Sequence, residues 1–443
     1  MIFNIDKQSL DELNLMGKFR QGSVYHLFNQ VRTRGGEKLL DTMFKNPLPD
    51  PDQINSRTAV FHFFQSANLS FPFDPNQLSL MQEYVDSGNE QGRIVSYLDT
   101  LIKKSLSGLT RDERYKKTIQ GLQATIIVLK KCYGFVERAD LMSGAYKKRV
   151  NGIKEVFQNE QLMQLVNTDI YKSISLRRIA EYDYLVRGKL NSAIQDILSF
   201  TAEIDVNIAV SNVAKARDFT YAQAVPKITN TLQAKELRHP CIDHAVGNDL
   251  EMQGDSNVIF LTGANMAGKS TFLRAVSTAV YMAHMGFPVA AAGMEFSVMD
   301  GIYTTVNLPD NLGIGASHFY AEVLRVKKIA TELNQGRSLF IVFDELFRGT
   351  NVKDAYEATV AITHAFALKK TSLFIISSHI VEAGEALKQR NNIGFFYLPT
   401  RMNGHNPTYT YTLEQGITDD RHGMIIIRNE GILDTLEAGL RTS

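Results

Sequence analysis

Two patterns of apolar and polar residues follow one another along the chain. Up to about residue 230, apolar residues recur every three or four positions, as they do in amphipathic helices. The clearest segments run over residues 118–136 and 174–210, and their low content of Gly and Pro predicts long helices of a lever or a bundle. Proline-rich breaks at residues 46–51 and 71–75 predict loops.

After Ala234, short apolar runs alternate with helical stretches. The runs at 258–261, 339–343 and 373–377 predict buried strands, and residues 319–333 and 423–441 predict helices. Strands that alternate with helices are typical of an α/β domain with a parallel sheet covered on both faces. We therefore expect an α-helical domain over residues 1–230 and an α/β domain with a C-terminal helical segment over residues 231–443.

A glycine-rich loop follows the first predicted strand of the α/β domain and leads into a predicted helix. In this context the loop predicts a phosphate-binding site for ATP or GTP, because its backbone N–H groups and the positive helix end attract the β-phosphate. Lys269 can reach the β- and γ-phosphates, and the Ser270 hydroxyl can ligate Mg²⁺. The predicted nucleotide-binding residues are Gly263, Ala264, Asn265, Met266, Ala267, Gly268, Lys269, Ser270 and Thr271.

Two further strands end in residues with catalytic chemistry. Asp344 and Glu345 follow the strand at 339–343, where Asp344 can hold Mg²⁺ and Glu345 can act as general base on the attacking water. His379 follows the strand at 373–377, where it can sense the γ-phosphate or the attacking water. The competing interpretations are helix capping for the two acids and a structural role for the histidine.

A second loop, at residues 310–317, is rich in Gly and Ser and precedes the predicted helix at 319–333. Free N–H groups at a helix start suit an anion. Since the first loop already serves the nucleotide of its own chain, this loop is a candidate to reach the nucleotide of a second subunit. An ordinary helix cap would explain the same residues equally well.

Composition narrows the class of protein only slightly. A chain of 443 residues is too long for one compact core, so we expect two to four domains. The net charge of +1 gives no global attraction to nucleic acid or membrane. A local excess does occur over residues 93–200, where 19 Lys and Arg accompany 11 Asp and Glu. A basic helical arm of this kind can neutralise DNA phosphates, although such runs are more often solvated helix faces.

Other features of the sequence predict a cytoplasmic protein without a membrane span. Cys132 and Cys241 have no metal-ligand spacing, which favours a reducing compartment over a disulfide framework. The N-terminus lacks the basic and apolar regions of a signal peptide, and the apolar runs are interrupted by polar residues.

Four of these motifs together resemble the MutS mismatch-repair ATPases. The loop with Asn265-Met266 before Gly-Lys-Ser-Thr is similar to the MutS phosphate loop. The run from Asp344-Glu345 to Arg348-Gly349-Thr350 resembles the MutS Asp-Glu-x-x-Arg-Gly-Thr. The loop with Ser317, Phe319 and Glu322 resembles the signature segment, and Ser378-His379 resembles the Thr-His switch. Their order and spacing agree with this family among ABC-type ATPases.

The resemblance extends more weakly over the rest of the chain. Residues 34–40, 46–48 and 54–57 are similar to the start of the MutS core domain, and residues 202–206 and 222–226 are similar to the end of its lever helices. Residues 238–240 resemble the entry to the ATPase, and residues 423–440 resemble the segment that packs on a partner subunit.

Several parts of a full MutS have no counterpart. The core pattern starts almost at Met1, so we expect the mismatch-recognition and connector domains to be absent. Phe135-Val136-Glu137 matches the letters of the mismatch wedge but lies in a predicted helix. We likewise expect no full clamp domain between the lever helices and no nuclease domain after the ATPase. Ala245 stands where the family often has an aromatic residue on the adenine, and Tyr411 is the candidate for its other face.

The resemblance implies a homodimeric, DNA-binding ATPase related to mismatch repair, with ATP and Mg²⁺ as cofactors. Lys269, Glu345 and His379 would be catalytic, Ser270 and Asp344 would hold the metal, and Ser317 would serve the opposite protomer. Two alternatives stay open: an ATPase acting on branched or unusual DNA in recombination, and an ATP-dependent dimer switch that binds a protein partner and not DNA. A repair or recombination protein is a further possible partner.

Overall fold

The computed structural model describes residues 3–17, 20–87, 102, 113–138, 146–170, 172, 174–264, 266–306, 318–403, 406–418, 431–432 and 435–436. The chain forms two compact units. The sheet unit comprises Met1–Leu27, Asn46–Thr58 and Ala214–Ser443, and the helical unit comprises Phe28–Lys45 and Ala59–Val213. These units differ from the single boundary predicted near residue 230, because two N-terminal segments pack with residues far along the chain.

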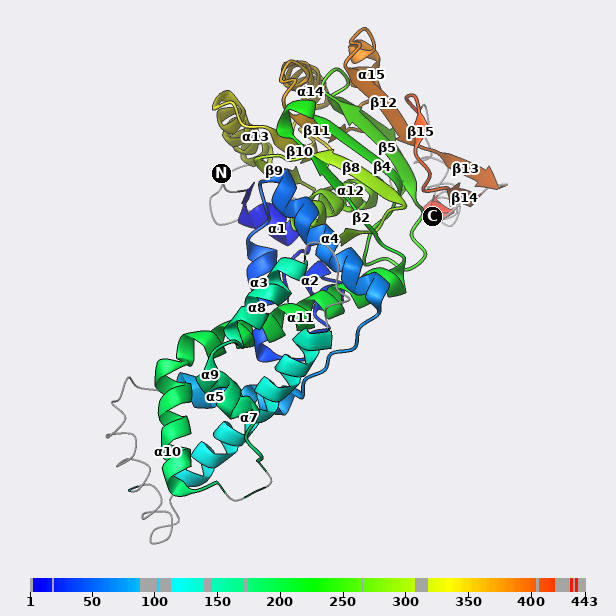
Figure 1. Ribbon diagram of the computed structural model, residues 1–443. Coiled ribbons are helices and arrows are strands. Elements are labelled where there is room, and N and C mark those ends of the chain that lie inside the picture. Colours follow the sequence, from blue (N-terminus) through cyan, green and yellow to red (C-terminus); the bar gives the residue numbers. More distant parts are fainter. Residues whose placement is uncertain are drawn as a thin grey trace. The chain divides into compact units, whose positions relative to one another are not determined.

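A seven-stranded sheet is the centre of the sheet unit (Figure 1). Its strand order is β1-β9-β10-β11-β6-β12-β15, and neighbouring strands are parallel except for β12 and β15. The strands are β1 (Asn4–Ile5), β6 (Val258–Gly263), β9 (Gly301–Thr305), β10 (Leu339–Phe343), β11 (Leu373–Ser377), β12 (Ile393–Leu398) and β15 (Glu414–Gln415). The three predicted strands are therefore present as β6, β10 and β11.

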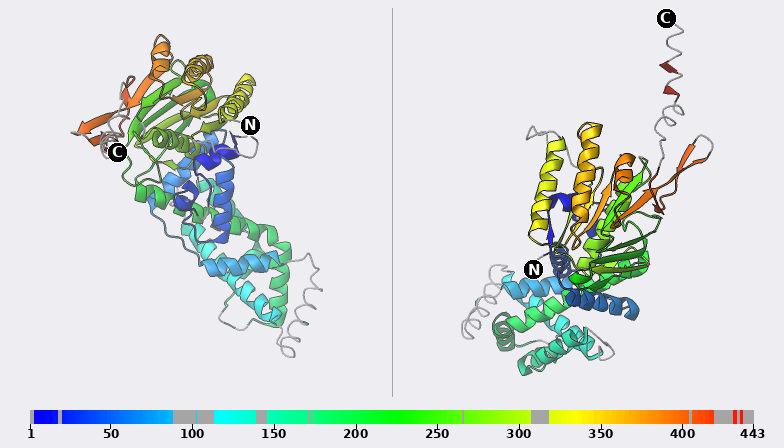
Figure 2. Two further views of the ribbon diagram at one scale, coloured as in Figure 1. Left: turned by 180° about the vertical axis from the view of Figure 1, so that it is seen from behind. Right: turned by 90° about the horizontal axis from the view of Figure 1, so that it is seen from above.

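Helices cover both faces of this sheet, which explains why its strands are apolar throughout. The side chains of Leu339, Ile341 and Phe343 alternate with those of Phe340 and Val342, and only the first set joins the core formed with α13 and α14. Helix α12 contacts β6, β9 and β10 separately. Figure 2 shows the yellow and orange helices α13 and α14 beside the sheet. The helices are α12 (Lys269–His284), α13 (His318–Asn334), α14 (Val352–Ala367) and α15 (Val381–Leu387).

Smaller elements complete the sheet unit. A four-stranded sheet has the order β3-β8-β4-β5, and two-stranded ribbons join β2 to β7 and β13 to β14. These strands are β2 (Thr220–Tyr221), β3 (Gln223–Val225), β4 (Thr231–Leu237), β5 (Asn248–Gln253), β7 (Pro288–Val289), β8 (Gly293–Ser297), β13 (Thr400–Asn403) and β14 (Asn406–Tyr409). Short helical segments are α1 (Lys7–Glu12), α2 (Val24–Phe28) and the 3₁₀ turn η4 (Lys227–Thr229).

The helical unit is built from helices whose apolar faces share one core. The predicted helix at 118–136 is part of α7, whereas the segment predicted at 174–210 forms two α-helices separated by a π-helical turn, η3. Pro51 and Pro75 each begin a helix, where a missing N–H costs no hydrogen bond. The elements are α3 (Arg34–Lys45), α4 (Pro51–Ala67), α5 (Pro75–Asp86), α7 (Arg114–Arg138), α8 (Lys147–Val156), α9 (Glu160–Val166), α10 (Leu176–Tyr184), η3 (Leu185–Lys189) and α11 (Asn191–Arg217). Residues 51–58 of α4 and residues 214–217 of α11 count with the sheet unit.

A buried carboxylate joins two distant motifs of the helical unit. Asp205 accepts hydrogen bonds from the backbone N–H groups of Arg32 and Thr33 and from the Thr33 hydroxyl, at 2.7–3.0 Å. A Cβ atom at Gly36 would lie 2.4 Å from this carboxylate, so the start of α3 requires glycine there. The two motifs that resembled the core and the lever helices are therefore neighbours in space.

Helix α11 is the one helix in the described ranges that is long and apolar enough to cross a membrane by length and composition. Its apolar window is 83% buried inside the structure, as expected for the core helix of a globular unit. The predicted helical segment at 423–441 falls almost entirely outside the described residues.

Candidate functional site

The phosphate loop leaves the carboxyl end of β6, which lies between β11 and β12 in the parallel sheet. Gly268 precedes α12 with φ of +102°, and an added Cβ would lie 2.9 Å from the ring of Tyr411. Only glycine meets both conditions, since other residues rarely adopt this backbone conformation. The sequence Gly-Lys-Ser therefore fixes where the loop ends and the helix begins.

Lys269 is buried at the base of this loop and is 5% exposed. Its ammonium group donates to the carbonyl oxygens of Gly263 at 2.7 Å and Ala264 at 3.1 Å. Burial lowers the pKa of Lys269, while the nearby carboxylates of Glu345 and Asp344 act in the opposite direction. The loop thus holds a buried cation beside the backbone N–H groups at the start of α12, which is an arrangement suited to phosphate.

Ser270, in the first turn of α12, is hydrogen-bonded to Asp344, which follows β10. Ser270 Oγ donates to Asp344 Oδ2 at 2.5 Å, and Ser377 Oγ donates to Asp344 Oδ1 at 2.5 Å. No group of three His, Cys, Asp or Glu side chains gathers among the described residues. Mg²⁺ in nucleotide sites usually takes only one or two protein carboxylates, with the rest of its shell supplied by phosphates and water. The hydroxyl and carboxylate of Ser270 and Asp344 fit that requirement.

Glu345 and His379 lie together at the ends of the adjacent strands β10 and β11. His379 Nε2 is 2.6 Å from Glu345 Oε1, and Arg348 donates to Glu345 Oε2 at 3.2 Å. The hydrogen bond from His379 is the main cause that lowers the pKa of Glu345 to about 2, although burial opposes it. Glu345 is therefore an oriented carboxylate at neutral pH.

The backbone after β10 is unusual for non-glycine residues. Glu345 has φ of +56° and Phe347 has φ of +63°. Such conformations persist only where neighbouring groups impose them, and they are common at functional sites. Here Glu345 N–H donates to Ser377 Oγ at 3.0 Å, and the Phe347 ring packs on Phe319 of α13 with centroids 5.8 Å apart. Ser377 therefore supports both acids, a role that the sequence analysis did not assign.

A cavity of about 360 Å³ borders the phosphate loop. Ala245, Gly268, Thr271 and Tyr411 are among its lining residues. Asn248 holds the Tyr411 segment in place, since its amide donates to Tyr411 O at 3.0 Å and accepts from Leu413 N–H at 2.6 Å. The sequence analysis also missed Asn248, because nothing near it in sequence marks it as part of a site.

The structure thus brings Lys269, Ser270, Asp344, Glu345 and His379 to one edge of the sheet. Tyr411 and Thr271 lie beside the adjoining cavity, while Met266 is 74% exposed at the tip of the loop. Asn265 and Ser317 are outside the described residues. Glu322 of the signature segment is described: burial raises its pKa to about 7, and its carboxylate accepts the N–H of Gly349.

A parallel sheet with a glycine-rich loop before a helix, and with acids at the end of a nearby strand, is an arrangement typical of α/β domains of the phosphate-loop type. Residues 259–436 match the family model for MutS domain V. These residues therefore belong to the MutS domain V family, and the similarity of the chain to MutS proteins extends beyond them.

Three relatives illustrate the extent of that similarity. A protein of Caldicellulosiruptor saccharolyticus called DNA mismatch repair protein MutS is 26% identical over 356 residues, which cover 76% of this chain and 41% of the relative. A protein of the same name from Fusobacterium nucleatum is 26% identical over 82% of this chain and 41% of the relative. The protein of this name from Acetivibrio thermocellus is 28% identical over 58% of this chain and 31% of its own length. The chain therefore spans about two fifths of the length of the first two relatives.

Proposed function

We propose that this protein is a MutS-type ATPase that hydrolyses ATP to ADP and phosphate. The observation that carries the proposal is the convergence of Lys269, Ser270, Asp344, Glu345 and His379 at the carboxyl ends of three neighbouring parallel strands. Ligands in open parallel sheets bind at this edge. A buried lysine that interacts electrostatically with an oriented carboxylate suits phosphoryl transfer to water.

The residues would divide the work of hydrolysis between them. The loop N–H groups and Lys269 would bind the β- and γ-phosphates, because they present positive charge in a partly buried setting. Ser270 and Asp344 would hold Mg²⁺, which would neutralise phosphate charge when bound. Glu345 would orient the attacking water and accept its proton, while His379 would leave Glu345 to donate to the γ-phosphate or the water. His379 would thereby distinguish ATP from ADP.

The cavity beside the loop supports a site for the adenine base. Its volume of about 360 Å³ is of the size that small-molecule pockets have. Tyr411, with 47% of its surface exposed, would stack on one face of the base. Ala245 on the cavity wall provides no aromatic ring, whereas His239, His244 and Phe272 also line the cavity and carry rings.

We further propose that the chain works as a homodimer on DNA in the cytoplasm, with a repair or recombination protein as a further possible partner. Ser317 would approach the nucleotide of the partner subunit, and the basic helices of the helical unit would contact DNA phosphates. ATP would favour the dimer geometry that closes on DNA, and bound DNA would in turn favour ATP, because coupling between two sites is reciprocal. The free thiols of Cys132 and Cys241 fit a reducing compartment.

Steady-state hydrolysis by the full chain tests this proposal. Phosphate release with Mg²⁺ and ATP would be measured alone and with perfect duplex, mismatched duplex and four-way junction DNA. We expect hydrolysis that Lys269→Ala abolishes, and stimulation by at least one DNA. An absence of hydrolysis under all four conditions, or turnover that persists in Lys269→Ala, would contradict the proposed activity. Hydrolysis that responds to no DNA would instead favour a switch that binds protein.

A further inference from the structure

An N-terminal segment, residues 3–15, forms one edge of the main sheet. Strand β1 pairs in parallel with β9, and Asn4 N–H donates to Asp300 O at 2.8 Å. A Cβ atom at Gly301 would lie only 2.3 Å from Asn4 O, so glycine is what allows this close approach. Phe3 is buried and its ring lies 4.4 Å from that of His284. The segment is therefore an integral part of the sheet unit.

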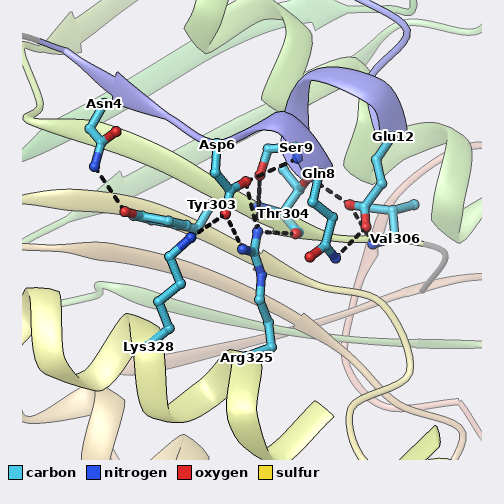
Figure 3. Close-up of polar contacts among 10 residues, drawn as sticks. All are labelled: Asn4, Asp6, Gln8, Ser9, Glu12, Tyr303, Thr304, Val306, Arg325 and Lys328. Atoms are coloured by element: carbon cyan, nitrogen blue, oxygen red, sulfur yellow. Dashed lines mark hydrogen bonds and ion pairs between the residues drawn. The ribbon is translucent and has the colours of Figure 1, made fainter. Parts of the chain in front are cut away.

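The same segment supplies most of the partners of a buried arginine. Arg325 of α13 is 6% exposed. Its guanidinium donates to both carboxylate oxygens of Asp6, to Ser9 Oγ at 3.1 Å and to Thr304 O at 2.8 Å. Figure 3 shows Asp6 and Ser9 on one side of Arg325 and α13 on the other. Without the segment, a charge would stay buried with one main-chain carbonyl, which is a costly state.

The segment also fixes the end of β9. Thr304 N–H donates to Ser9 Oγ at 2.9 Å. Glu12 accepts from the Thr304 hydroxyl at 2.7 Å and from Val306 N–H at 3.0 Å. Consequently α1 is bonded to the strand end on one side and to α13 on the other (Figure 3).

Helix α13, which these contacts hold, also contacts the loop after β10 through residues in its first turns. Glu322, one turn before Arg325, accepts the N–H of Gly349, and Phe319 packs on Phe347. Gly349 and Phe347 belong to the loop that begins with Asp344 and Glu345. A continuous series of contacts therefore runs from Asp6 through α13 to the residues that set the backbone of Glu345.

We propose that the N-terminal segment positions the catalytic loop through α13, with Asp6 and Arg325 as the positioning pair. Neither residue touches the candidate nucleotide site, so both act on Glu345 through the placement of α13. The consequence for hydrolysis rests on the proposed function, whereas the consequence for the placement of α13 does not.

The test compares Asp6→Asn with Asp11→Asn in the full chain. Asparagine still caps α1, so Asp6→Asn removes the ion pair with Arg325 and Lys328 but keeps the helix start. Asp11 is exposed on the same helix and gives the matched control. We expect Asp6→Asn to lower kcat about tenfold and leave KM within about twofold, because misplacement of a catalytic group slows chemistry without removing binding. Turnover equal to that of Asp11→Asn would overturn the proposal.

A double-mutant cycle separates positioning from general damage. If Asp6 and Arg325 act as one pair, Asp6→Asn combined with Arg325→Met should be no slower than the slower single variant. Fully additive losses would contradict a shared route. If Arg325→Met does not fold, Lys328→Met replaces it, since Lys328 is half-exposed and also donates to Asp6, at 2.9 Å.

Hydrogen exchange gives a measurement that does not need ATP hydrolysis. Asp6→Asn should speed exchange in α13 and at residues 345–350 relative to Asp11→Asn, while the start of α12 stays unchanged. If Asp6→Asn leaves hydrogen exchange in α13 unchanged, the inference is wrong even if the protein hydrolyses ATP. If the protein does not hydrolyse ATP but Asp6→Asn still speeds hydrogen exchange in α13, the positioning of α13 by the N-terminal segment is supported. Only the proposed function is then rejected.

Discussion

His379 and Glu345 share a hydrogen bond of 2.6 Å between Nε2 and Oε1. The two residues end adjacent parallel strands, so the register of β10 against β11 sets the distance between them. Together with Arg348, His379 occupies both carboxylate oxygens of Glu345 and keeps its pKa low. Glu345 is thus an ionised base that His379 and Arg348 hold in place. Rotation of either partner would free one carboxylate oxygen of Glu345 to bind a water molecule.

Glu345→Gln tests this arrangement directly. An amide cannot accept a proton from water, so we expect kcat for ATP to fall by at least about 100-fold. Binding of ATP should persist, because Lys269 and the loop are unchanged. Single-turnover phosphate release and the Kd for ATP are the measurements. Glu385→Gln, at an exposed position on α15, is the matched control, and near-normal turnover in Glu345→Gln would remove Glu345 from the role of base.

Those parts of the site that depend on local sequence could be predicted from the chain. The loop at 262–271 and the acids after 339–343 each follow a short apolar run that is typical of a buried strand. The carboxyl ends of parallel strands then meet at one edge. The convergence of Lys269, Asp344 and His379 follows from that rule without any knowledge of side-chain contacts.

Contacts between distant residues could not be predicted in this way. Strand β1 has two residues and pairs with β9, and Asn4 bonds to Tyr303 across 299 positions. The bonds of Ser377 and Asn248 likewise depend on tertiary placement. The segment 174–210 reads as one helix because its apolar spacing continues through η3, where Arg187 bonds to Asp183 and to Ser87 O.

Gly268→Ala should lower the free energy of unfolding of the protein and also its affinity for nucleotide. The φ of +102° and the ring of Tyr411 2.9 Å from an added Cβ both oppose alanine. We expect a loss of about 1–2 kcal/mol in the free energy of unfolding, measured in urea. Gly293→Ala is the control, since an added Cβ there meets nothing within 4 Å. Equal unfolding midpoints for the two variants would show that the loop has another accessible conformation.

The basic cluster at residues 147–149 separates into two kinds of residue. Lys147 and Lys148 are exposed, whereas Arg149 bonds to Glu203 at 3.0 Å and to Asp196 at 2.8 Å and lies over the Phe200 ring. If these lysines contact DNA, Lys147→Glu with Lys148→Glu should weaken binding and reduce the salt slope by about 2. Fluorescence anisotropy over a salt series measures both quantities.

Two comparisons make the DNA experiment decisive. Lys353→Glu with Lys388→Glu changes the net charge of the chain equally, on α14 and just after α15. An equal loss of affinity in both pairs would show a general charge effect and no patch. Arg149→Glu should instead destabilise the helical unit, because it places a carboxylate beside Glu203 and Asp196.

His284 predicts a pH dependence of stability in the acid range. Its ring is fully buried, Nε2 accepts Met299 N–H at 3.0 Å, and Nδ1 lies 2.9 Å from Val280 O. Burial lowers the pKa of His284 to about 4. The unfolded chain takes up this proton below about pH 6.5 and the folded protein only near pH 4, so His284 makes the folded state less stable as pH falls between these values. Below pH 4 its contribution no longer changes.

The variant His284→Gln isolates this contribution from those of other groups, such as Glu322, whose raised pKa acts in the opposite direction between pH 7 and 4.5. The free energy of unfolding of the wild type minus that of the variant should decrease by about 3 kcal/mol from pH 6.5 to 4. Urea titrations at half-unit intervals of pH measure it. His26→Gln, at an exposed position, controls for the removal of a histidine. A difference that stays constant over this range would mean that His284 becomes protonated inside the folded protein as readily as in the unfolded chain.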